Sequence, residues 1–136
     1  MTIVVTERVH FATSSCGKRT MQSGEAPKPV EEPTGRVQRV ARLMALAIRF
    51  ERLIREGSVR DQAEIATLGY VTRARVTQVM NLLHLAPDIQ EAVLFLPLMT
   101  EGRDPVTERD LRPIAAEINW ARQRDMWEQL RVSRVC

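Results

Sequence analysis

The segment covering residues 61–84 constrains the fold of this chain most, because its small and branched residues are spaced for two short helices that cross closely. The first helix needs a small residue at the crossing. The chain must then turn, an apolar residue must seal the turn, and branched residues of the second helix must face the crossing. These positions are held, in that order, by Ala66, Gly69-Tyr70, Val71, Val76 and Val79. The spacing predicts a helix-turn-helix over residues 61–84.

Both helices of this motif have N-terminal capping signals. The Asp61 side chain can accept a hydrogen bond from a backbone N–H of the first turn. The side chain of Glu64, three residues later, can accept from the backbone N–H of Asp61, and this reciprocal pair is a capping box. Thr72 is a suitable N-cap for the second helix, which we expect to run to about His84.

Apolar residues also recur at three- and four-residue steps on both sides of the motif, which is typical of amphipathic helices. The first of these predicted helices covers residues 37–56 and the second covers residues 87–96. A third begins at Thr107, with Asp110 as capping partner, and Pro113 bends or shortens it. A last helix begins at about Asn119. Gly57 occupies the usual position just past a helix end.

Residues 1–35 differ in composition from the rest of the chain. In residues 2–11, apolar and polar residues alternate weakly, and Val, Ile and Thr are frequent. This pattern allows a short strand or an extended arm. Residues 12–35 are rich in Ser, Gly and Pro. Such a segment can bury too little apolar surface to offset the conformational entropy lost on ordering, so we expect a flexible linker. We therefore expect an all-α fold, with a mostly disordered arm over residues 1–35 and one helical domain over residues 36–132.

Composition is that of an ordinary globular protein. The chain has 136 residues, of which 44% are hydrophobic and 27% charged, and this excludes wholesale disorder and a disulfide knot. Cys16 and Cys136 have no spacing partner, so we expect free thiols in a reducing cytoplasm. No basic leader of a secretory signal is visible, and the longest apolar run, residues 92–99, is too short to span a bilayer. We expect a cytoplasmic protein with no membrane partner.

The side chains that the second helix of the motif leaves exposed carry the functional prediction. They are Thr72, Arg73, Ala74, Arg75, Thr77, Gln78 and Asn81. Arg can pair bidentately with guanine, Gln and Asn with adenine, and the Ala methyl group can contact thymine. No acidic residue occurs between Ile65 and Pro87, so nothing on this helix repels phosphate. The segment predicts sequence-specific binding of double-stranded DNA.

Structural explanations compete with this function. Helical hairpins with Ala and Gly at similar spacing also occur where packing is their only role, and Arg73 and Arg75 can serve as solubilising charges. Of the 20 basic residues 18 are arginine, which suits phosphate and guanine, but GC-rich coding gives the same bias. The net charge of +3 provides only weak non-specific attraction, so a local surface must supply most of the affinity.

The segment EIATLGYVTRARVTQVMNLLHLAPDIQEAV resembles the DNA-binding segment of the ParB/KorB family of partition proteins, in which L-x-L-P-x-x-[IV]-Q follows a helix-turn-helix. The downstream element is matched by Leu83, Leu85, Pro87, Ile89 and Gln90, with Ala86 inserted before the proline. The resemblance covers residues 61–96. The nucleotide-binding region of the family, with its G-E-R-R motif, has no counterpart here, so CTPase activity is not implied. The chain also resembles small helix-turn-helix proteins encoded beside site-specific recombinases in bacterial mobile elements. The two resemblances imply a nucleoid-associated regulator of transcription, or an accessory protein of recombination or partition.

The resemblance implies roles for individual residues. It places on the base-contacting face Thr72, Arg73, Ala74, Thr77 and Gln78. Gln62 would contact a phosphate through its side chain and the positive end of its helix. Arg75 and Asn81 would contact the DNA backbone or flanking bases. Tyr70 stands where the family usually has glycine, so either a tyrosine adopts a left-handed backbone or the turn shifts.

The main alternative function is a protein-interaction adaptor. Trp120 and Trp127 share one face of the last predicted helix, which can be core, a docking surface or a dimer interface. An enzyme is disfavoured, because His10 and His84 have no partner at catalytic or metal-ligand spacing and no glycine-rich phosphate loop precedes a helix. We expect no catalytic residue, metal or cofactor. The expected partner is double-stranded DNA, with a second copy of the chain and a recombinase as further candidates.

Overall fold

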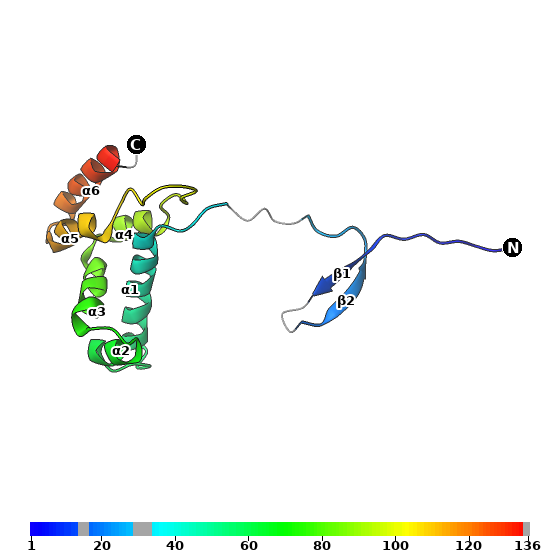
Figure 1. The fold of residues 1–136 in the computed structure, drawn as a ribbon, viewed down its shortest axis with the longest axis horizontal. Helices are drawn as coiled ribbons and strands as arrows, with labels where there is room; N and C mark the ends of the chain where they lie inside the picture. Colours follow the sequence, from blue (N-terminus) through cyan, green and yellow to red (C-terminus); the bar gives the residue numbers. More distant parts are fainter. Residues whose placement is uncertain (14–16, 29–33, 135–136) are drawn as a thin grey trace. The chain divides into compact units, whose positions relative to one another are not determined.

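The computed structural model describes residues 1–13, 17–28 and 34–134 (Figure 1). The chain forms two compact units, Met1–Pro33 and Thr34–Cys136, which we call the hairpin unit and the helical unit. The predicted free thiols of Cys16 and Cys136 lie outside the described residues. Within the described ranges, no helix has the length and apolar character needed to cross a membrane.

The hairpin unit contains a two-stranded sheet, so the predicted all-α fold is wrong. Strands β1 (Val9–Thr13) and β2 (Arg19–Ser23) pair antiparallel, with Phe11 opposite Met21. The protein is mixed α/β, and its N-terminal arm is partly structured instead of mostly disordered. The sequence did not reveal β2 because backbone pairing holds the hairpin while nearly all its side chains stay exposed. Burial therefore imposes no apolar alternation on this strand.

The helical unit consists, among its described residues, of six α-helices and one short 3-10 helix (Figure 1). They are α1 (Arg39–Arg55), α2 (Gln62–Leu68), α3 (Arg73–Met80), the 3-10 helix η1 (Asn81–His84), α4 (Pro87–Leu94), α5 (Glu108–Ala116) and α6 (Trp120–Arg134). The helix predicted to run from Thr72 to about His84 is thus divided, because its α-helical part ends at Met80. Pro113 lies inside α5, which continues three residues beyond it.

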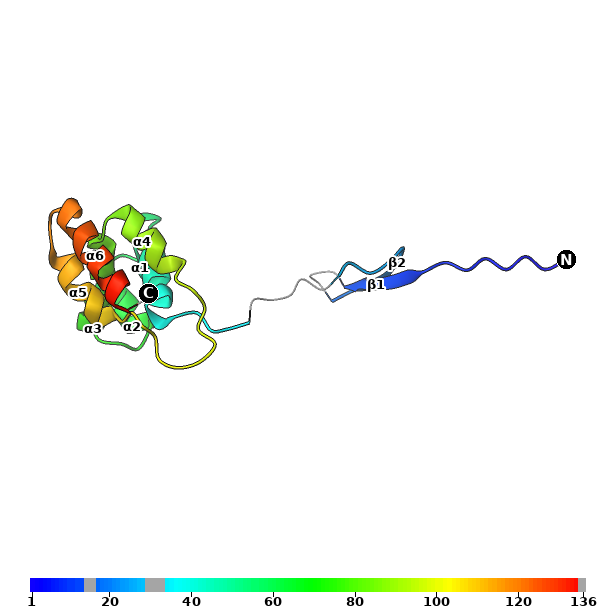
Figure 2. The same cartoon turned by 90° about the horizontal axis from the view of Figure 1, so that it is seen from above.

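Helix α1 is the central element of the helical unit. It packs against α3, η1 and α4, and Figure 1 shows it running alongside α3. Figure 2 shows α6 next to α5, with which it is also in contact. The largest buried apolar side chains of this main core are Met44, Leu82, Leu85, Ile89, Leu111 and Trp127. The core therefore joins the first helix of the unit to its last three.

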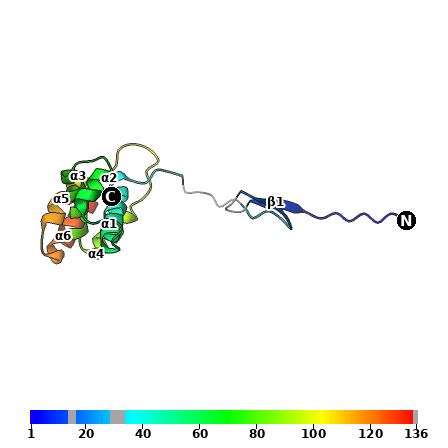
Figure 3. The ribbon, with the colours of Figure 1, turned by 90° about the horizontal axis from the view of Figure 1, so that it is seen from below.

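A second, smaller apolar cluster fixes the helix-turn-helix to α1. Its buried members are Val59, Ile65, Ala66 and Val76, and partly buried residues of α1 pack against them. Ala66 of α2 and Val76 of α3 belong to the small and branched positions that the sequence pattern requires. Figure 3 shows α2 and α3 next to each other in this arrangement.

A buried glutamine of α6 connects three other parts of the helical unit. The Gln123 side chain accepts a hydrogen bond from the N–H of Ala86 (2.8 Å). It donates to the carbonyl groups of His84 (3.0 Å) and Glu117 (2.7 Å). These bonds fix the start of α4 and the end of α5 relative to α6.

The chain enters the helical unit along the loop between α4 and α5. Arg36 and Met99 form an antiparallel bridge with two backbone hydrogen bonds of 2.9 Å. Gly35 has a φ of +136°, and a Cβ atom there would lie 2.9 Å from a neighbouring Cβ, so the position requires glycine. Asp104 of the loop accepts hydrogen bonds from the Arg36 guanidinium and from the N–H of Arg39 (2.7 Å). The loop thereby caps the first turn of α1.

Candidate functional site

The turn of the helix-turn-helix contains a tyrosine with a left-handed backbone. Tyr70 has a φ of +51°, and it is the one non-glycine residue with positive φ in the described part of the chain. The turn therefore does not shift, and the tyrosine adopts the conformation that glycine adopts more easily. The N–H of Val71 donates to the carbonyl of Ala66 (3.1 Å) and closes the turn, while the Tyr70 side chain is 96% exposed.

Side-chain caps fix where α2 and α3 begin. Asp61 accepts a hydrogen bond from the N–H of Glu64 (2.9 Å), as predicted. The reciprocal bond differs from the prediction, because Glu64 accepts from the N–H of Arg60 (2.8 Å), one residue before the cap. The Thr72 hydroxyl oxygen accepts from the N–H of Arg75 (3.2 Å) and begins α3. Both helix starts are therefore set by local hydrogen bonds.

Six of the predicted site residues form an exposed polar face, which we call the outer face. They are Thr72, Arg73, Ala74, Thr77, Gln78 and Asn81. On the opposite side of α3, Val76 and Val79 are buried. Asn81 belongs to η1 and not to α3, so its position follows the 3-10 turn instead of α-helical spacing.

Gln62 is the first residue of α2 and is joined to the outer face. The Thr77 hydroxyl donates to Gln62 Oε1 (3.0 Å), which links the N-terminus of α2 to the middle of α3. No hydrogen bond from the Gln62 amide NH₂ group occurs among the described residues. This group therefore stays able to donate to a phosphate oxygen.

Arg75 is held by α5 instead of standing free beside the outer face. Its Nη1 atom donates to both carboxylate oxygens of Glu108 (2.8 and 3.0 Å) and to Gln78 Oε1 (3.3 Å). The Arg75 side chain is 31% exposed and that of Glu108 only 14%. The sequence could not show this contact, because the carboxylate comes from a helix 33 residues further along the chain.

Glu108 is shared by two arginines. Burial of the carboxyl group acts to raise its pKa, but the hydrogen bond and charge of Arg75, followed by those of Arg112, hold the pKa of Glu108 below its ordinary value. Arg112 forms the second ion pair, at 3.4 Å. Because one carboxylate faces two guanidinium groups, the cluster keeps a net positive charge.

Sequence reasoning missed Arg109 and Arg112 of α5. Arg112 lines a groove of about 310 Å³ together with Gln78 and Asn81 of the outer face. Arg109 lines an adjoining cleft of about 520 Å³ that also includes Arg75 and Arg112. Arginines on helices are common on solvated surfaces, so no sequence signal distinguishes these two from the others. Their significance comes from the position of α5 beside α3 and η1.

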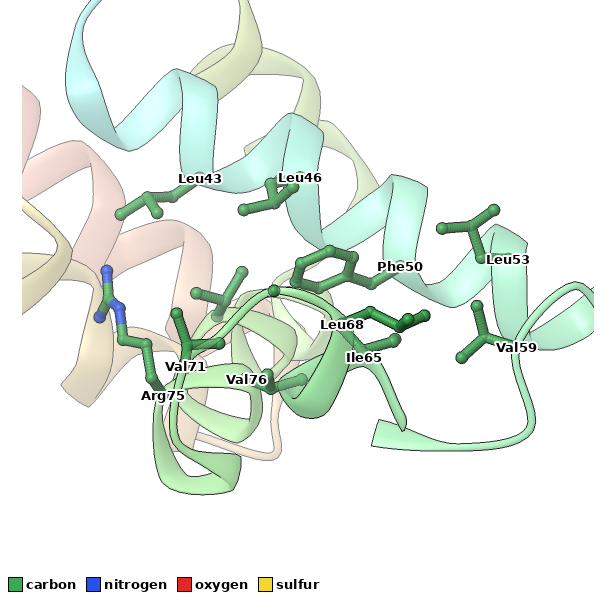
Figure 4. A pocket seen from close by; sticks show the side chains of 12 residues that line it. Leu43, Leu46, Phe50, Leu53, Val59, Ile65, Leu68, Val71, Arg75 and Val76 are labelled. Carbon is green, nitrogen blue, oxygen red and sulfur yellow. The ribbon is translucent and has the colours of Figure 1, made fainter. Parts of the chain in front are cut away.

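An apolar groove of about 480 Å³ lies between α1 and the helix-turn-helix (Figure 4). Leu43, Leu46 and Phe50 of α1 point toward the turn, and Leu68 and Val71 face them. Arg75 is the one charged residue among the described residues that line the groove. The groove thus runs along the contact by which α1 supports the turn.

The two tryptophans proposed for the adaptor surface have different environments. Trp127 is 5% exposed and belongs to the main core, whereas Trp120 is 49% exposed. One of the two rings therefore serves packing, and an adaptor surface would have only Trp120.

No protein-family model, curated protein sequence or solved structure matches this chain. The geometry of the site is therefore what indicates a function for this chain.

Proposed function

We propose that the chain binds a specific site in double-stranded DNA, with α3 in the major groove and the N-terminus of α2 against the phosphate backbone. The outer face is the observation that carries this proposal. It presents six exposed side chains, and α3 contains no carboxylate that would repel phosphate. An α-helix is also narrow enough to enter a major groove. The protein would regulate transcription or assist recombination or partition.

Arg73 and Gln78 are the side chains best suited to read base edges. Arg73 is exposed and takes part in no ion pair among the described residues, so its guanidinium group is available to a guanine. Gln78 accepts from Arg75, which leaves its NH₂ group free to donate to an acceptor such as a purine N7 atom. The Ala74 methyl group is exposed between them and can contact a thymine methyl group.

Rigid support of the outer face also favours this function. Base contacts discriminate only when side chains are held in a fixed geometry. The Thr72 cap fixes the start of α3, the Thr77–Gln62 bond ties α3 to α2, and buried Val76 anchors α3 to α1. The outer face therefore belongs to a well-supported element and not to a loose surface helix.

Selection of bound duplexes from a random DNA pool tests the proposal. We expect an enriched sequence motif and an affinity that falls steeply as salt rises. The R73A/Q78A variant should lose this preference and bind the selected site at least about tenfold more weakly, since one bidentate base contact contributes about 1–3 kcal/mol. If the protein binds as the predicted homodimer, the motif should be a palindrome with half-sites about 34–36 Å apart. A recombinase partner stays a prediction.

A matched control is available on other surfaces of the helical unit. The R49A/Q129A variant removes the same residue types from exposed positions on α1 and α6, and it should select the same motif as the parent. Absence of duplex binding by the parent at every salt concentration would refute the proposed function. Selection of an unchanged motif by R73A/Q78A would show that the outer face is not the base-contacting surface.

A further inference from the structure

Helices α2 and α5 contact opposite sides of α3. The Thr77 side chain donates a hydrogen bond to Gln62 of α2, whereas the Arg75 side chain donates a hydrogen bond to Glu108 of α5. Residues two positions apart point about 200° away from each other around an α-helix. The outer face is therefore flanked by α2 on one side and by α5 on the other.

The α5 side of α3 has a cleft of about 520 Å³ that is rich in arginine. Its charged lining residues are Arg39, Arg75, Arg109, Arg112, Asp104 and Glu108. Arg39 comes from the first turn of α1, so the cleft brings together residues from three helices and from the loop before α5. Four cations and two carboxylates leave an excess of positive charge.

Both carboxylates of the cleft are already paired. Asp104 accepts from the N–H of Arg39 and from the guanidinium of Arg36, and these groups hold the pKa of Asp104 below its ordinary value. Glu108 is paired with Arg75 and Arg112. Among the residues that the structure describes, the side chains of Arg39 and Arg109 take part in no ion pair or hydrogen bond. The positive charge is thus free to bind an anion from outside.

We propose that Arg39, Arg109 and Arg112 form a phosphate-binding surface for DNA, on the side of α3 opposite to α2. The inference rests on the proposed function, because α3 must lie in the major groove for this surface to meet DNA. Phosphates of the two strands border the two edges of that groove, which is about 12 Å wide. The N-terminus of α2 faces one edge, and these arginines face the other.

Arg112 is the residue that connects the phosphate-binding surface to the outer face. It lines the cleft with Arg75, and it also lines the adjoining groove with Gln78 and Asn81. Its side chain is about half exposed, so it can reach a phosphate without loss of packing. Arginine is well suited to this role because its planar guanidinium group can bind phosphate oxygens in pairs.

The R109Q/R112Q variant of the full chain tests this inference against R42Q/R49Q, which removes the same charge from exposed positions on α1 outside the cleft. Affinity is measured against salt concentration on the selected duplex and on an unrelated duplex. Each lost phosphate contact lowers the slope of log affinity against log salt by about 0.9. We expect R109Q/R112Q to lower the slope by about 1.8 on both duplexes and to keep the selected motif. The control should leave the slope nearly unchanged.

Arg112 also forms an ion pair with Glu108, so the loss of this pair could by itself change DNA binding by R109Q/R112Q. Single variants at arginines outside this ion pair separate the two effects. Within the described part of the chain, the side chains of Arg39 and Arg109 form no ion pair, so R109Q and R39Q should each lower the slope by about 0.9. Equal slopes for R109Q/R112Q and the control pair would overturn the inference while leaving DNA binding by α3 intact. A parent that binds no duplex would instead refute the proposed function. Unchanged circular dichroism and melting temperature confirm that each variant is folded.

Discussion

The hairpin unit and the helical unit are stabilised by different parts of the chain. Phe11 and Met21 face each other across the hairpin, yet they are 70% and 66% exposed, so backbone pairing is its main support. The helical unit instead buries a continuous apolar core around Met44 and Leu111. Isolated two-stranded hairpins are only marginally stable in water. The spacing of apolar residues therefore predicts secondary structure in the helical unit, where burial requires that spacing. It does not predict the hairpin, which is held by backbone hydrogen bonds.

The largest effect is expected at a buried polar residue of the helical unit. Gln123→Leu keeps the side-chain size but leaves one backbone N–H and two carbonyl groups without their partner. We expect the free energy of unfolding to fall by about 3 kcal/mol, since each buried unsatisfied group costs about 1–3 kcal/mol. Urea denaturation followed by tryptophan fluorescence measures this change, because both tryptophans lie in α6.

Gln38→Leu is the matched control for this substitution. Gln38 is equally buried, but within the described structure its side chain makes a single hydrogen bond, to the Pro97 carbonyl (3.0 Å), and its Oε1 atom has no partner. The substitution loses one hydrogen bond but also removes a buried acceptor that has no partner, and the second effect offsets part of the first. We therefore expect the free energy of unfolding to change by no more than about 1 kcal/mol. Similar losses for the two variants would show that burial alone, and not the bonds of Gln123, supports this region.

A smaller effect of opposite sign is expected at the turn. Tyr70→Gly removes a left-handed tyrosine whose side chain is almost fully exposed. A left-handed non-glycine residue costs about 1–2 kcal/mol, and the greater chain entropy of glycine in the unfolded state offsets part of the gain. We expect the free energy of unfolding to rise by up to about 1 kcal/mol in the same denaturation assay. Tyr70→Ala should give no such gain, and an equal gain from alanine would contradict backbone strain as the cause.

The smallest effect is expected in the hairpin unit. Phe11→Thr replaces an exposed aromatic residue by another residue that is common in strands. Tryptophan fluorescence should report the same unfolding free energy of the helical unit within about 0.5 kcal/mol, since exposed substitutions rarely exceed that value. A larger shift would show that the hairpin contributes to the stability of the helical unit.

The elements of the helical unit could be predicted well where apolar spacing and capping coincide. Asp61 and Thr72 cap the helices that they were expected to begin, and Thr107 forms its capping box with Asp110. The division of the second motif helix at Met80 could not be predicted, because no proline or glycine marks it. The strand β2 was missed for a different reason, because all its side chains are exposed and burial imposes no apolar alternation on it.

The candidate site was only partly accessible from the sequence. Exposure of Arg73, Thr77 and Gln78 follows from helical periodicity, which places them opposite the buried valines. The pairing of Arg75 with Glu108 does not follow from it, because periodicity says nothing about which distant helix will pack alongside. Arg75 was therefore expected to be free, although it is held by a carboxylate.

The order of residues along this chain determines by itself where the helix-turn-helix lies and which of its side chains face outward, because caps, turn residues and apolar spacing act over a few positions. Tertiary structure alone decides that α5 lies beside α3, that Glu108 neutralises part of Arg75, and that Arg39, Arg109 and Arg112 meet at one cleft. Contacts between helices far apart in sequence depend on how complementary surfaces pack as a whole, and no local pattern specifies that outcome.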